Sequence, residues 1–448
     1  MYTQLSAPIN VQWELTSLCN HKCVHCYNFW RDNGSCKPAP TAIARVFSGE
    51  FVASELIANK VFHVTLTGGE PLIVINKYRG ALEMLRDAGI QIGMNSNLGL
   101  LTERNVALLR ELGIGSILTS LMASEESLND KLAGNVGAFK RTIEGICLAV
   151  KSGFRVAINT VVTKKNLHDI RNIADLVANL GAKSFCATKA TKPLLCDDFS
   201  QYHLDHEELN KMFIDLLWAK DSLGLDIDSL EHYPGCTFFS TETRSAFGSR
   251  NCSAGKTGCS IGYDGGIRPC SHAHMNYGNI ADGLSVAWRA MSEWRDGSLV
   301  PDHCKKECKD FPMRCSGGCR IEAYNSTGKI NSPDPFCGNI QRMVASTPRS
   351  ERVDNGSLKA DDVVIPYRNL RLRDEPFGYI AYRSPKYWMA VDAIMGKILD
   401  SAHSRGGFTS RDLVTAYNVS ESRALYTLRL LVTKKLVAGG VKIHNERR

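Results

Sequence analysis

The stretch VFHVTLTGGEP, residues 61–71, indicates the fold most clearly. Its apolar and β-branched residues predict a buried strand, and Gly68 and Gly69 then predict a turn with close backbone approach. Similar runs occupy residues 9–16, 91–97, 116–124, 155–163 and 182–188. The segments between the runs have helical patterns. This alternation predicts an α/β fold built on a parallel sheet, open or closed as a barrel.

Polar residues stand where these predicted strands end. Gly68, Asn97, Ser120 and Asn159 each lie at or near the end of a different strand. In parallel α/β sheets the functional residues gather at the carboxyl ends of the strands. We therefore expect these residues to meet at one edge of the sheet.

The composition of the 448 residues is that of a folded protein, with 44% hydrophobic and 22% charged residues. It excludes a wholly disordered, collagen-like or coiled-coil chain. No apolar run is long enough to predict a transmembrane helix, and the first residues lack the pattern of a signal peptide. We therefore expect a cytoplasmic protein with no membrane partner.

The 16 cysteines are the most informative part of the composition. The cytosol keeps thiols reduced, so clustered cysteines there indicate metal or iron–sulfur ligation rather than disulfides. The net charge of +8 is mild for this length, and residues 351–448 hold 17 Lys and Arg against 11 Asp and Glu. This excess is too weak to imply DNA by itself, and we expect no nucleic-acid partner.

The chain divides into four stretches that differ in residue pattern and composition. Residues 1–230 contain the strand and helix alternation, and residues 231–345 hold nine cysteines but few long apolar runs. A segment so short of core needs bound metal to hold its shape. Residues 346–366 are polar and predict a linker. Residues 367–448 form a further small domain.

The last domain has the pattern of a winged helix-turn-helix. Residues 368–382 predict a hairpin, and helical patterns follow at residues 388–403, 409–418 and 420–435. Thr409 and Asp412 form a predicted capping box at the start of the second helix. Two strands followed by three short helices make up this winged helix-turn-helix.

The first cysteine group is Cys19-x3-Cys23-x2-Cys26, just after the first predicted strand. Three thiolates on one loop can hold three irons of a [4Fe–4S] cube and leave the fourth iron open. A zinc site is the alternative, because structural zinc takes four ligands and His21 or His25 could supply the fourth.

This motif, followed by Tyr27, resembles that of the radical S-adenosylmethionine (SAM) superfamily, as does the stretch Thr67–Pro71. The resemblance implies a partial (β/α)6 barrel similar to a TIM barrel. It also implies that the GGEP stretch lies against the methionine amino group of SAM, since glycine permits close approach and a carboxylate suits an ammonium group.

The resemblance extends to other positions along about 200 residues. The SAM contacts it implies are Gly68, Gly69, Glu70, Pro71, Asn95, Ser96, Asn97, Ser120 and Asn159. Taken singly, each Ser or Asn is better explained as a turn or cap residue, and it is their order along the chain that supports the resemblance. Met122 and Ala123 depart from the usual Asp-Gly, and Ala133 stands where many members have Arg.

Eight further cysteines provide enough thiolates for two complete four-ligand sites. A pair of zinc ribbons is one interpretation. The pattern also resembles the SPASM extension of radical SAM enzymes, which carries two auxiliary [4Fe–4S] clusters, for a total of three. That resemblance implies two ligand sets, Cys252, Cys259, Cys270 and Cys319 for the first, and Cys304, Cys308, Cys315 and Cys337 for the second.

The remaining cysteines have no assigned role. Cys147 and Cys186 fall in apolar patterns and are predicted to lie in the core. Cys36, Cys196 and Cys236 fall in loops, where each is either reactive or an ordinary loop residue. Ser271 stands where sulfatase-maturing relatives carry an Asp that serves as a base, so we do not expect formylglycine formation.

The last domain resembles the recognition element of enzymes that modify ribosomally made peptides. In that family a leader peptide adds as a strand to the wing and lies against the last helix, a general mode of binding extended peptides. The basic residues of that helix, Arg423, Arg429, Lys434 and Lys435, are candidates to pair with leader carboxylates. Their alternative role is a solvated helix face.

Together these resemblances imply an enzyme that uses a 5′-deoxyadenosyl radical to modify a precursor peptide. An intramolecular cross-link, thioether, C–C or C–O, is expected, with the auxiliary clusters as electron acceptors and a flavodoxin- or ferredoxin-type protein as reductant. No catalytic side chain is assigned. The alternatives are a peptide epimerase, an enzyme for another protein or a small molecule, and a zinc-binding winged-helix DNA-binding regulator.

Overall fold

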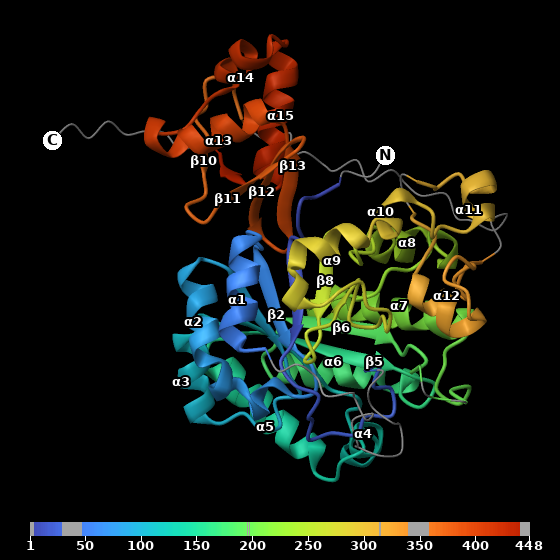
Figure 1. Ribbon diagram of the computed structural model, residues 1–448. Coiled ribbons are helices and arrows are strands. Elements are labelled where there is room, and N and C mark those ends of the chain that lie inside the picture. The colour runs from blue at the N-terminus through green and yellow to red at the C-terminus, as the bar shows by residue number, and fades with distance from the viewer. Residues whose placement is uncertain are drawn as a thin grey trace. The chain divides into compact units, whose positions relative to one another are not determined.

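The computed structural model describes residues 4–28, 47–194, 196, 198–312, 315–338 and 358–439. The chain divides into two compact units, one spanning residues 7–347 and the other residues 348–448 together with residues 3–6. Figure 1 shows both. Of the predicted linker, residues 346–357 lie outside the described residues, whereas Ile365–Pro366 form a short strand, β10.

A single curved sheet organises the larger unit. Its strands are β1 (Asn10–Glu14), β2 (His63–Thr67), β3 (Gln91–Asn95), β4 (Ser116–Ser120), β5 (Arg155–Val162), β6 (Ser184–Lys189), β7 (Asp226–Asp228), β8 (Gly258–Ile261) and β9 (Ile267–Arg268). They lie in the order β7-β6-β5-β4-β3-β2-β1-β8-β9, and only the β8–β9 pair is antiparallel. The predicted α/β fold with a parallel sheet is therefore confirmed.

The strands form where the sequence supplies apolar residues to the interior. Val11 pairs with Val64, and Trp13 pairs with Leu66, in the parallel register of β1 and β2. All four side chains are buried. Each predicted run from residue 9 to residue 188 coincides with one of the strands β1 to β6, and β6 extends one residue beyond its run.

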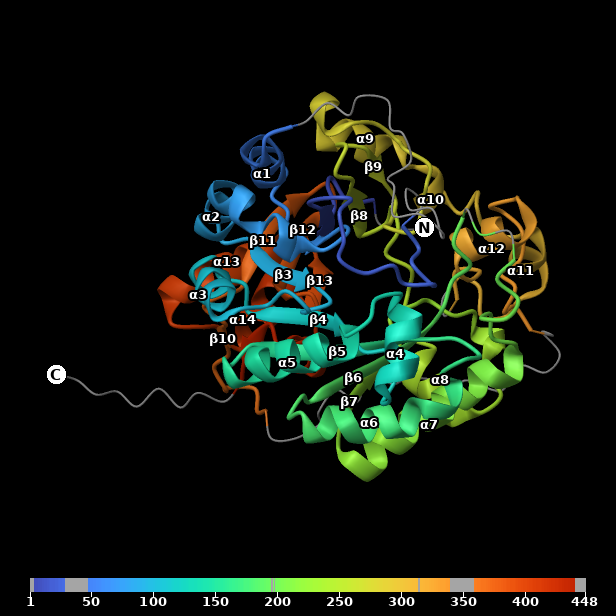
Figure 2. The same cartoon turned by 90° about the horizontal axis from the view of Figure 1, so that it is seen from below.

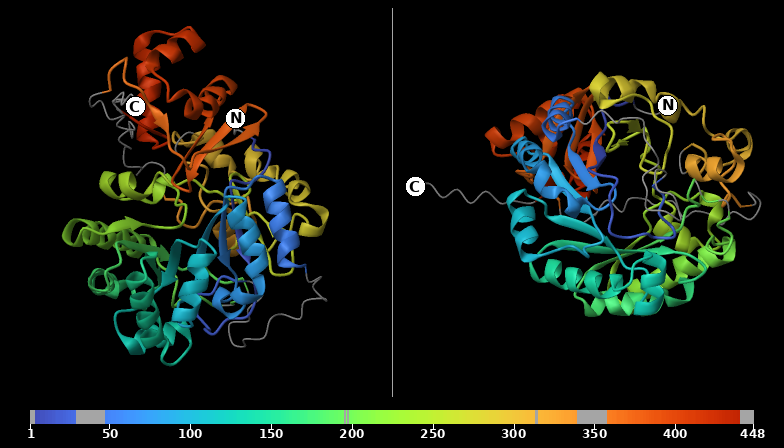
Figure 3. Two further views of the ribbon diagram at one scale, coloured as in Figure 1. Left: turned by 90° about the vertical axis from the view of Figure 1, so that its left-hand side faces the viewer. Right: turned by 60° about the horizontal axis from the view of Figure 1, so that its bottom comes forward.

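Helices follow most of the strands. Those of the larger unit are α1 (Gly49–Ala58), α2 (Arg79–Asp87), α3 (Glu103–Glu111), α4 (Glu126–Ala133), α5 (Ala138–Lys151), α6 (Ile170–Asn179), α7 (His206–Leu223), α8 (Thr241–Phe247), α9 (Leu284–Ala290), α10 (Glu293–Asp296), α11 (Asp302–Glu307) and α12 (Arg320–Thr327). Figure 2 and the right-hand view of Figure 3 show α2, α3, α5 and α6 along the outside of the curved sheet. This leaves the inside of the curve for the loops that follow the strands.

The cysteine-rich segment belongs to the same compact unit as the sheet. Its strand β8 extends the sheet by pairing parallel to β1, with Cys259 opposite Val11. A buried ion pair between Arg268 of β9 and Glu14 of β1, 2.5 Å apart, fixes the two segments together. The segment is therefore built directly onto the edge of the barrel.

The smaller unit has its own hydrophobic core. Its elements are β11 (Arg371–Glu375), β12 (Gly378–Ser384), β13 (Tyr387–Val391), α13 (Ala393–Arg405), α14 (Ser410–Tyr417), α15 (Glu421–Thr433) and the pair β10 and β14 (Val437–Ala438). Leu399, Leu428 and Leu431 are among the buried core residues. The predicted hairpin is present as β11 and β12, and the Thr409–Asp412 capping box is confirmed.

One predicted helix is wrong at its start. Residues 388–391 belong to β13, the third strand of an antiparallel sheet, rather than to a helix. The helix begins only after Asp392, whose side chain accepts a hydrogen bond from the Met395 amide at 2.8 Å. This N-cap sets the boundary that apolar periodicity alone misplaced. Among the described residues, no helix is long and apolar enough to cross a membrane.

Candidate functional site

The loop carrying Cys19, Cys23 and Cys26 leaves the carboxyl end of β1 and is held by backbone hydrogen bonds to the end of α4. The Lys22 amide donates to Ala133 O at 2.9 Å, and the Val24 amide donates to Leu132 O at 3.1 Å. These bonds hold the backbone of the loop between Cys19 and Cys26 against α4.

The two glycines after β2 pack against the residues that lead into this loop. The Gly69 amide donates to Thr16 O at 2.6 Å, and the Glu70 amide donates to Leu18 O at 2.7 Å. A Cβ atom on Gly69 would lie 1.9 Å from Leu18 O, which excludes every other residue without a backbone shift. The glycine turn therefore approaches another backbone closely, as predicted, and the backbone it approaches is that of Thr16 and Leu18.

The carboxylate of Glu70 is buried and fixed by three donors. It accepts from Ser96 Oγ at 2.7 Å, from the Asn97 amide at 2.8 Å and from the Leu72 amide at 3.0 Å. Burial raises the pKa of Glu70, and these hydrogen bonds oppose the rise by stabilising the anion. The carboxylate is thus held where β2 and β3 end.

A cavity of about 510 Å³ opens among these loops. The predicted site residues that line it are Cys19, Cys23, Cys26, Gly68, Gly69, Glu70, Asn95, Ser96, Asn97, Ser120 and Asn159. Pro71 is instead buried in the short turn Pro71–Ile73 behind the wall. The structure therefore gathers the three thiols and the polar strand ends around one space.

Asn97 connects the two halves of this wall. Its side-chain amide donates to Asn20 Oδ1 at 2.8 Å, while its backbone amide donates to Glu70. Asn159 is held by Thr188, whose hydroxyl donates to Asn159 Oδ1 at 2.9 Å. Hydrogen bonds between neighbouring loops and strands therefore hold Asn97 and Asn159 in position.

The sequence did not single out a buried ionic cluster at the end of β6. Lys189 Nζ lies 3.0 Å from Glu231 Oε2 and 2.5 Å from Glu322 Oε1. Burial opposes the charge of Lys189, but the two carboxylates outweigh it and hold its pKa well above the usual value. Lys189 and Glu231 line the cavity, so a fixed charge pair faces the ligand space. The rule that functional residues follow the strands would have found Lys189.

A second contact joins the cysteine loop to the cysteine-rich segment. The ring of Tyr27 stacks on His272 at 4.0 Å between centroids, with the planes 15° apart. Arg268 donates to Ser271 O at 3.3 Å and to Ala273 O at 2.8 Å, which fixes the turn after Cys270. Ser271 and His272 reach the same cavity, so this turn forms part of its wall.

The cysteines of the first predicted auxiliary set lie in this region. Cys259 is buried in β8. Burial raises the pKa of Cys270 to about 12, and the charge of Cys252 adds to the rise. Burial also raises the pKa of Cys319, with Glu322 and Cys252 contributing.

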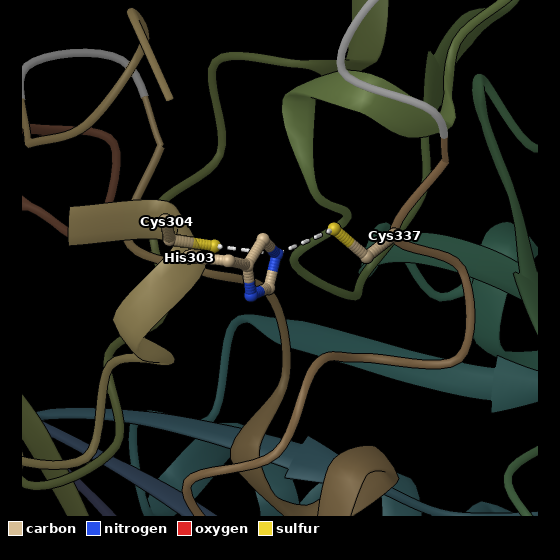
Figure 4. A group of neighbouring side chains, drawn as sticks. All are labelled: His303, Cys304 and Cys337. Atoms are coloured by element: carbon tan, nitrogen blue, oxygen red, sulfur yellow. Dashed lines mark hydrogen bonds between the residues drawn. The ribbon is translucent and has the colours of Figure 1, made fainter. Parts of the chain in front are cut away.

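The second predicted set shares one small cavity. The thiols that line it are Cys236, Cys304, Cys308, Cys315 and Cys337. Figure 4 shows His303 between two of these residues. Its Nε2 lies 3.3 Å from Cys304 Sγ and 3.6 Å from Cys337 Sγ.

The remaining cysteines have different surroundings. Cys186 is buried in β6, as predicted, but Cys147 is exposed, so its predicted core position is wrong. Cys147 lies on the outward face of α5, whereas Gly145 and Ile146 face inward. Cys196 donates to Asp198 O at 3.3 Å, and Cys36 lies outside the described residues.

The smaller unit has a groove of its own, of about 320 Å³, between β13 and the helices α14 and α15. Arg423 lines it, whereas Arg429 donates to Leu358 O at 3.2 Å and Lys435 Nζ lies 5.0 Å from the centre of the Tyr387 ring. Within the described part of the sheet, β13 pairs only with β12, so its other edge is open. The structure thus places only one of the four predicted basic residues, Arg423, in the groove.

Comparison with known proteins shows what the larger unit is similar to. Residues 13–177 match the family model of the radical SAM superfamily. An AdoMet-dependent heme synthase of Methanosarcina barkeri is 27% identical over 351 residues, covering 75% of this chain and 98% of that protein. The mycofactocin maturase MftC of Mycolicibacterium smegmatis is 26% identical over 357 residues, covering 78% of this chain and 87% of the relative.

Solved structures share the fold. The crystal structure of Streptococcus suis SuiB bound to precursor peptide SuiA superposes with a TM-score of 0.57 at 17% sequence identity. The match covers 75% of this chain and 76% of SuiB.

Proposed function

We propose that this protein is a radical SAM enzyme that modifies a ribosomally made precursor peptide by radical chemistry. The match of residues 13–177 to the radical SAM family model supports this proposal. The observation that carries the proposal is the shared cavity, in which three thiols stand beside a glycine turn and a fixed carboxylate. The names of the mycofactocin maturase and of peptide-bound SuiB support a peptide as substrate.

The residues of the cavity fit SAM and a [4Fe–4S] cluster. Cys19, Cys23 and Cys26 would supply three thiolates and leave one iron open for the cofactor. The Gly68–Gly69 backbone and the Glu70 carboxylate would face the methionine part of SAM. When bound, this pair supplies a 5′-deoxyadenosyl radical that removes a hydrogen atom from carbon.

The protein's own part in the reaction is positioning. The donors from Ser96, Asn97 and Leu72 keep Glu70 in one orientation, so it can hold an ammonium group without rearranging. Lys189 and Glu231 give the cavity a polar wall that can orient a peptide group or take up a proton.

We infer that the modification is an intramolecular cross-link. When the substrate carbon radical is joined to an S–H, O–H or C–H position, one further electron and one proton must leave, so the cross-link requires an electron acceptor. The two cysteine sets of residues 252–337 would hold auxiliary clusters, and these clusters would accept that electron. Epimerisation would instead require a hydrogen donor.

We propose that the smaller unit binds the leader part of the peptide. The open edge of β13 can accept an added strand, and the groove beside it would receive the leader's side chains. Arg423 would pair with a leader carboxylate. A small-molecule substrate is the competing reading, favoured by the relative named as a heme synthase.

Replacing Cys23 with Ala tests the first cluster. The variant should lose 5′-deoxyadenosine formation, because two thiolates no longer hold the cluster, and should keep its affinity for the leader peptide. Cys196→Ala is the matched control and should retain both. SAM cleavage by the Cys23→Ala protein would contradict the assignment.

Deleting residues 360–448 tests the smaller unit. The truncated protein should still form 5′-deoxyadenosine in the absence of peptide, since its cavity lies within residues 7–347. Its affinity for the leader, measured by fluorescence anisotropy, should fall sharply. Unchanged affinity would exclude this unit as the leader-binding site, and zinc in place of iron in purified protein would favour the DNA-binding regulator.

A further inference from the structure

The cavity of the second auxiliary set holds one thiol more than a four-iron cube needs. A [4Fe–4S] cluster takes one protein ligand at each iron. Five cysteines line this cavity, and Cys236 is the one that the motif spacing does not include. Cys236 could therefore serve as a second possible ligand for an iron that one of the other four thiols also reaches.

The distance between Cys236 and Cys337 indicates that this other thiol is Cys337. Cys236 Sγ lies 3.3 Å from Cys337 Sγ, which places both sulfur atoms at the same side of the cavity. Sulfur ligands at two corners of a cube must lie farther apart than this, so Cys236 and Cys337 can serve the same corner. Cys304 Sγ also lies within 4.8 Å of Cys337 Sγ. The resemblance to the SPASM motif already gives Cys304 a corner of its own, so Cys236 is the thiol left to share one.

The protein builds this juxtaposition from both sides. Thr237, which follows Cys236, donates from its Oγ1 to the carbonyl of Phe336 at 2.8 Å, and Phe336 directly precedes Cys337. A Cβ atom on Gly338 would lie 2.5 Å from Cys236 O, so only glycine permits this approach at that position. The short turn Gly235–Thr237 is therefore fixed against residues 336–338.

We propose that Cys236 and Cys337 are alternative ligands of one iron in the second auxiliary cluster, with Cys304, Cys308 and Cys315 holding the other three. This inference rests on the proposed function, since it requires an iron–sulfur cluster at this site. The paired thiols allow that iron to exchange one ligand for the other while the cluster stays bound.

The test measures iron and acid-labile sulfide per chain, with Mössbauer spectra, in anaerobically reconstituted full-length variants. Cys236→Ser and Cys337→Ser should each keep the wild-type iron content. The double variant should lose about four irons. Cys308 lines the same cavity and has no second thiol in contact with it among the described residues. Cys308→Ser should therefore lose about four irons by itself.

Two results would overturn the pairing: a Cys337→Ser protein that loses as much iron as Cys308→Ser, or a double variant that keeps the wild-type content. Cys337→Ala repeats the test without a side-chain oxygen that could replace the thiol, and far-ultraviolet circular dichroism checks folding. A wild-type protein that binds zinc, or only the first cluster, would instead refute the cluster assignment in the proposed function.

Discussion

Single residues at the mouth of the barrel are constrained by the backbone beside them. Gly69 is required because any side chain would collide with the carbonyl of Leu18. Glu70 is likewise fixed, because three donors hold its carboxylate. The conformation of this turn therefore depends on its fit to the cysteine loop as much as on its fit to a ligand.

Replacing Gly69 with Ala tests whether the turn must fit closely against the cysteine loop. The added methyl group should destabilise the protein by about 1–3 kcal/mol through overpacking. Displacement of the cysteine loop should lower 5′-deoxyadenosine formation on the order of 100-fold. Gly115→Ala is the control, because a Cβ atom there meets open space, and its activity should match the wild type.

His232 should make the folded state sensitive to acid. Its Nδ1–H donates to Arg250 O at 2.5 Å, and burial lowers its pKa to about 4. Between pH 6.5 and 4 the unfolded chain binds a proton that the folded protein does not, so stability falls as the pH falls through this window.

Urea unfolding at pH 7 and pH 5 measures this effect. His232 should contribute about 2 kcal/mol of the stability lost between the two values. His232→Gln should show a correspondingly smaller loss, and the exposed control His168→Gln should behave as the wild type. An identical pH dependence in His232→Gln would contradict the linkage.

At the scale of elements, the end of β6 is tied to two later segments by charge. Lys189 contacts Glu231 beyond β7 and Glu322 in α12, and all three are shielded from solvent. A buried charge left without its partner is strongly unfavourable. This cluster therefore fixes the cysteine-rich segment against the barrel.

Lys189→Met should destabilise the protein by about 3–5 kcal/mol, because it leaves two carboxylates buried together. Lys211→Met is the matched control in α7: its partner Asp215 keeps Arg171 at 2.7 Å. That change should cost less than about 1 kcal/mol. Thermal unfolding compares the two, and equal losses would argue against a structural role for the buried cluster.

At the scale of the whole molecule, stability is distributed unevenly. The sheet and its helices bury a continuous apolar core, whereas residues 236–337 contain short elements and many cysteines. Such a segment depends on bound metal for much of its folding free energy.

Iron removal by a chelator should therefore expose this segment selectively. Limited proteolysis should cut within residues 236–337 before it cuts within residues 63–189, and reconstituted protein should resist both cuts. Mass spectrometry of the fragments locates the cuts. First cleavage within the sheet would show that the segment does not depend on metal.

The sequence by itself determined the strand and helix alternation, the cysteine groups and the glycine turn, because local periodicity and motif spacing encode them. It misplaced the start of α13, where an Asp cap overrides apolar periodicity, and the exposure of Cys147, which depends on helix rotation. Only the tertiary structure brought Lys189 to Glu322 and Cys236 to Cys337. Such contacts join residues about 100 or more positions apart, and no local pattern specifies them.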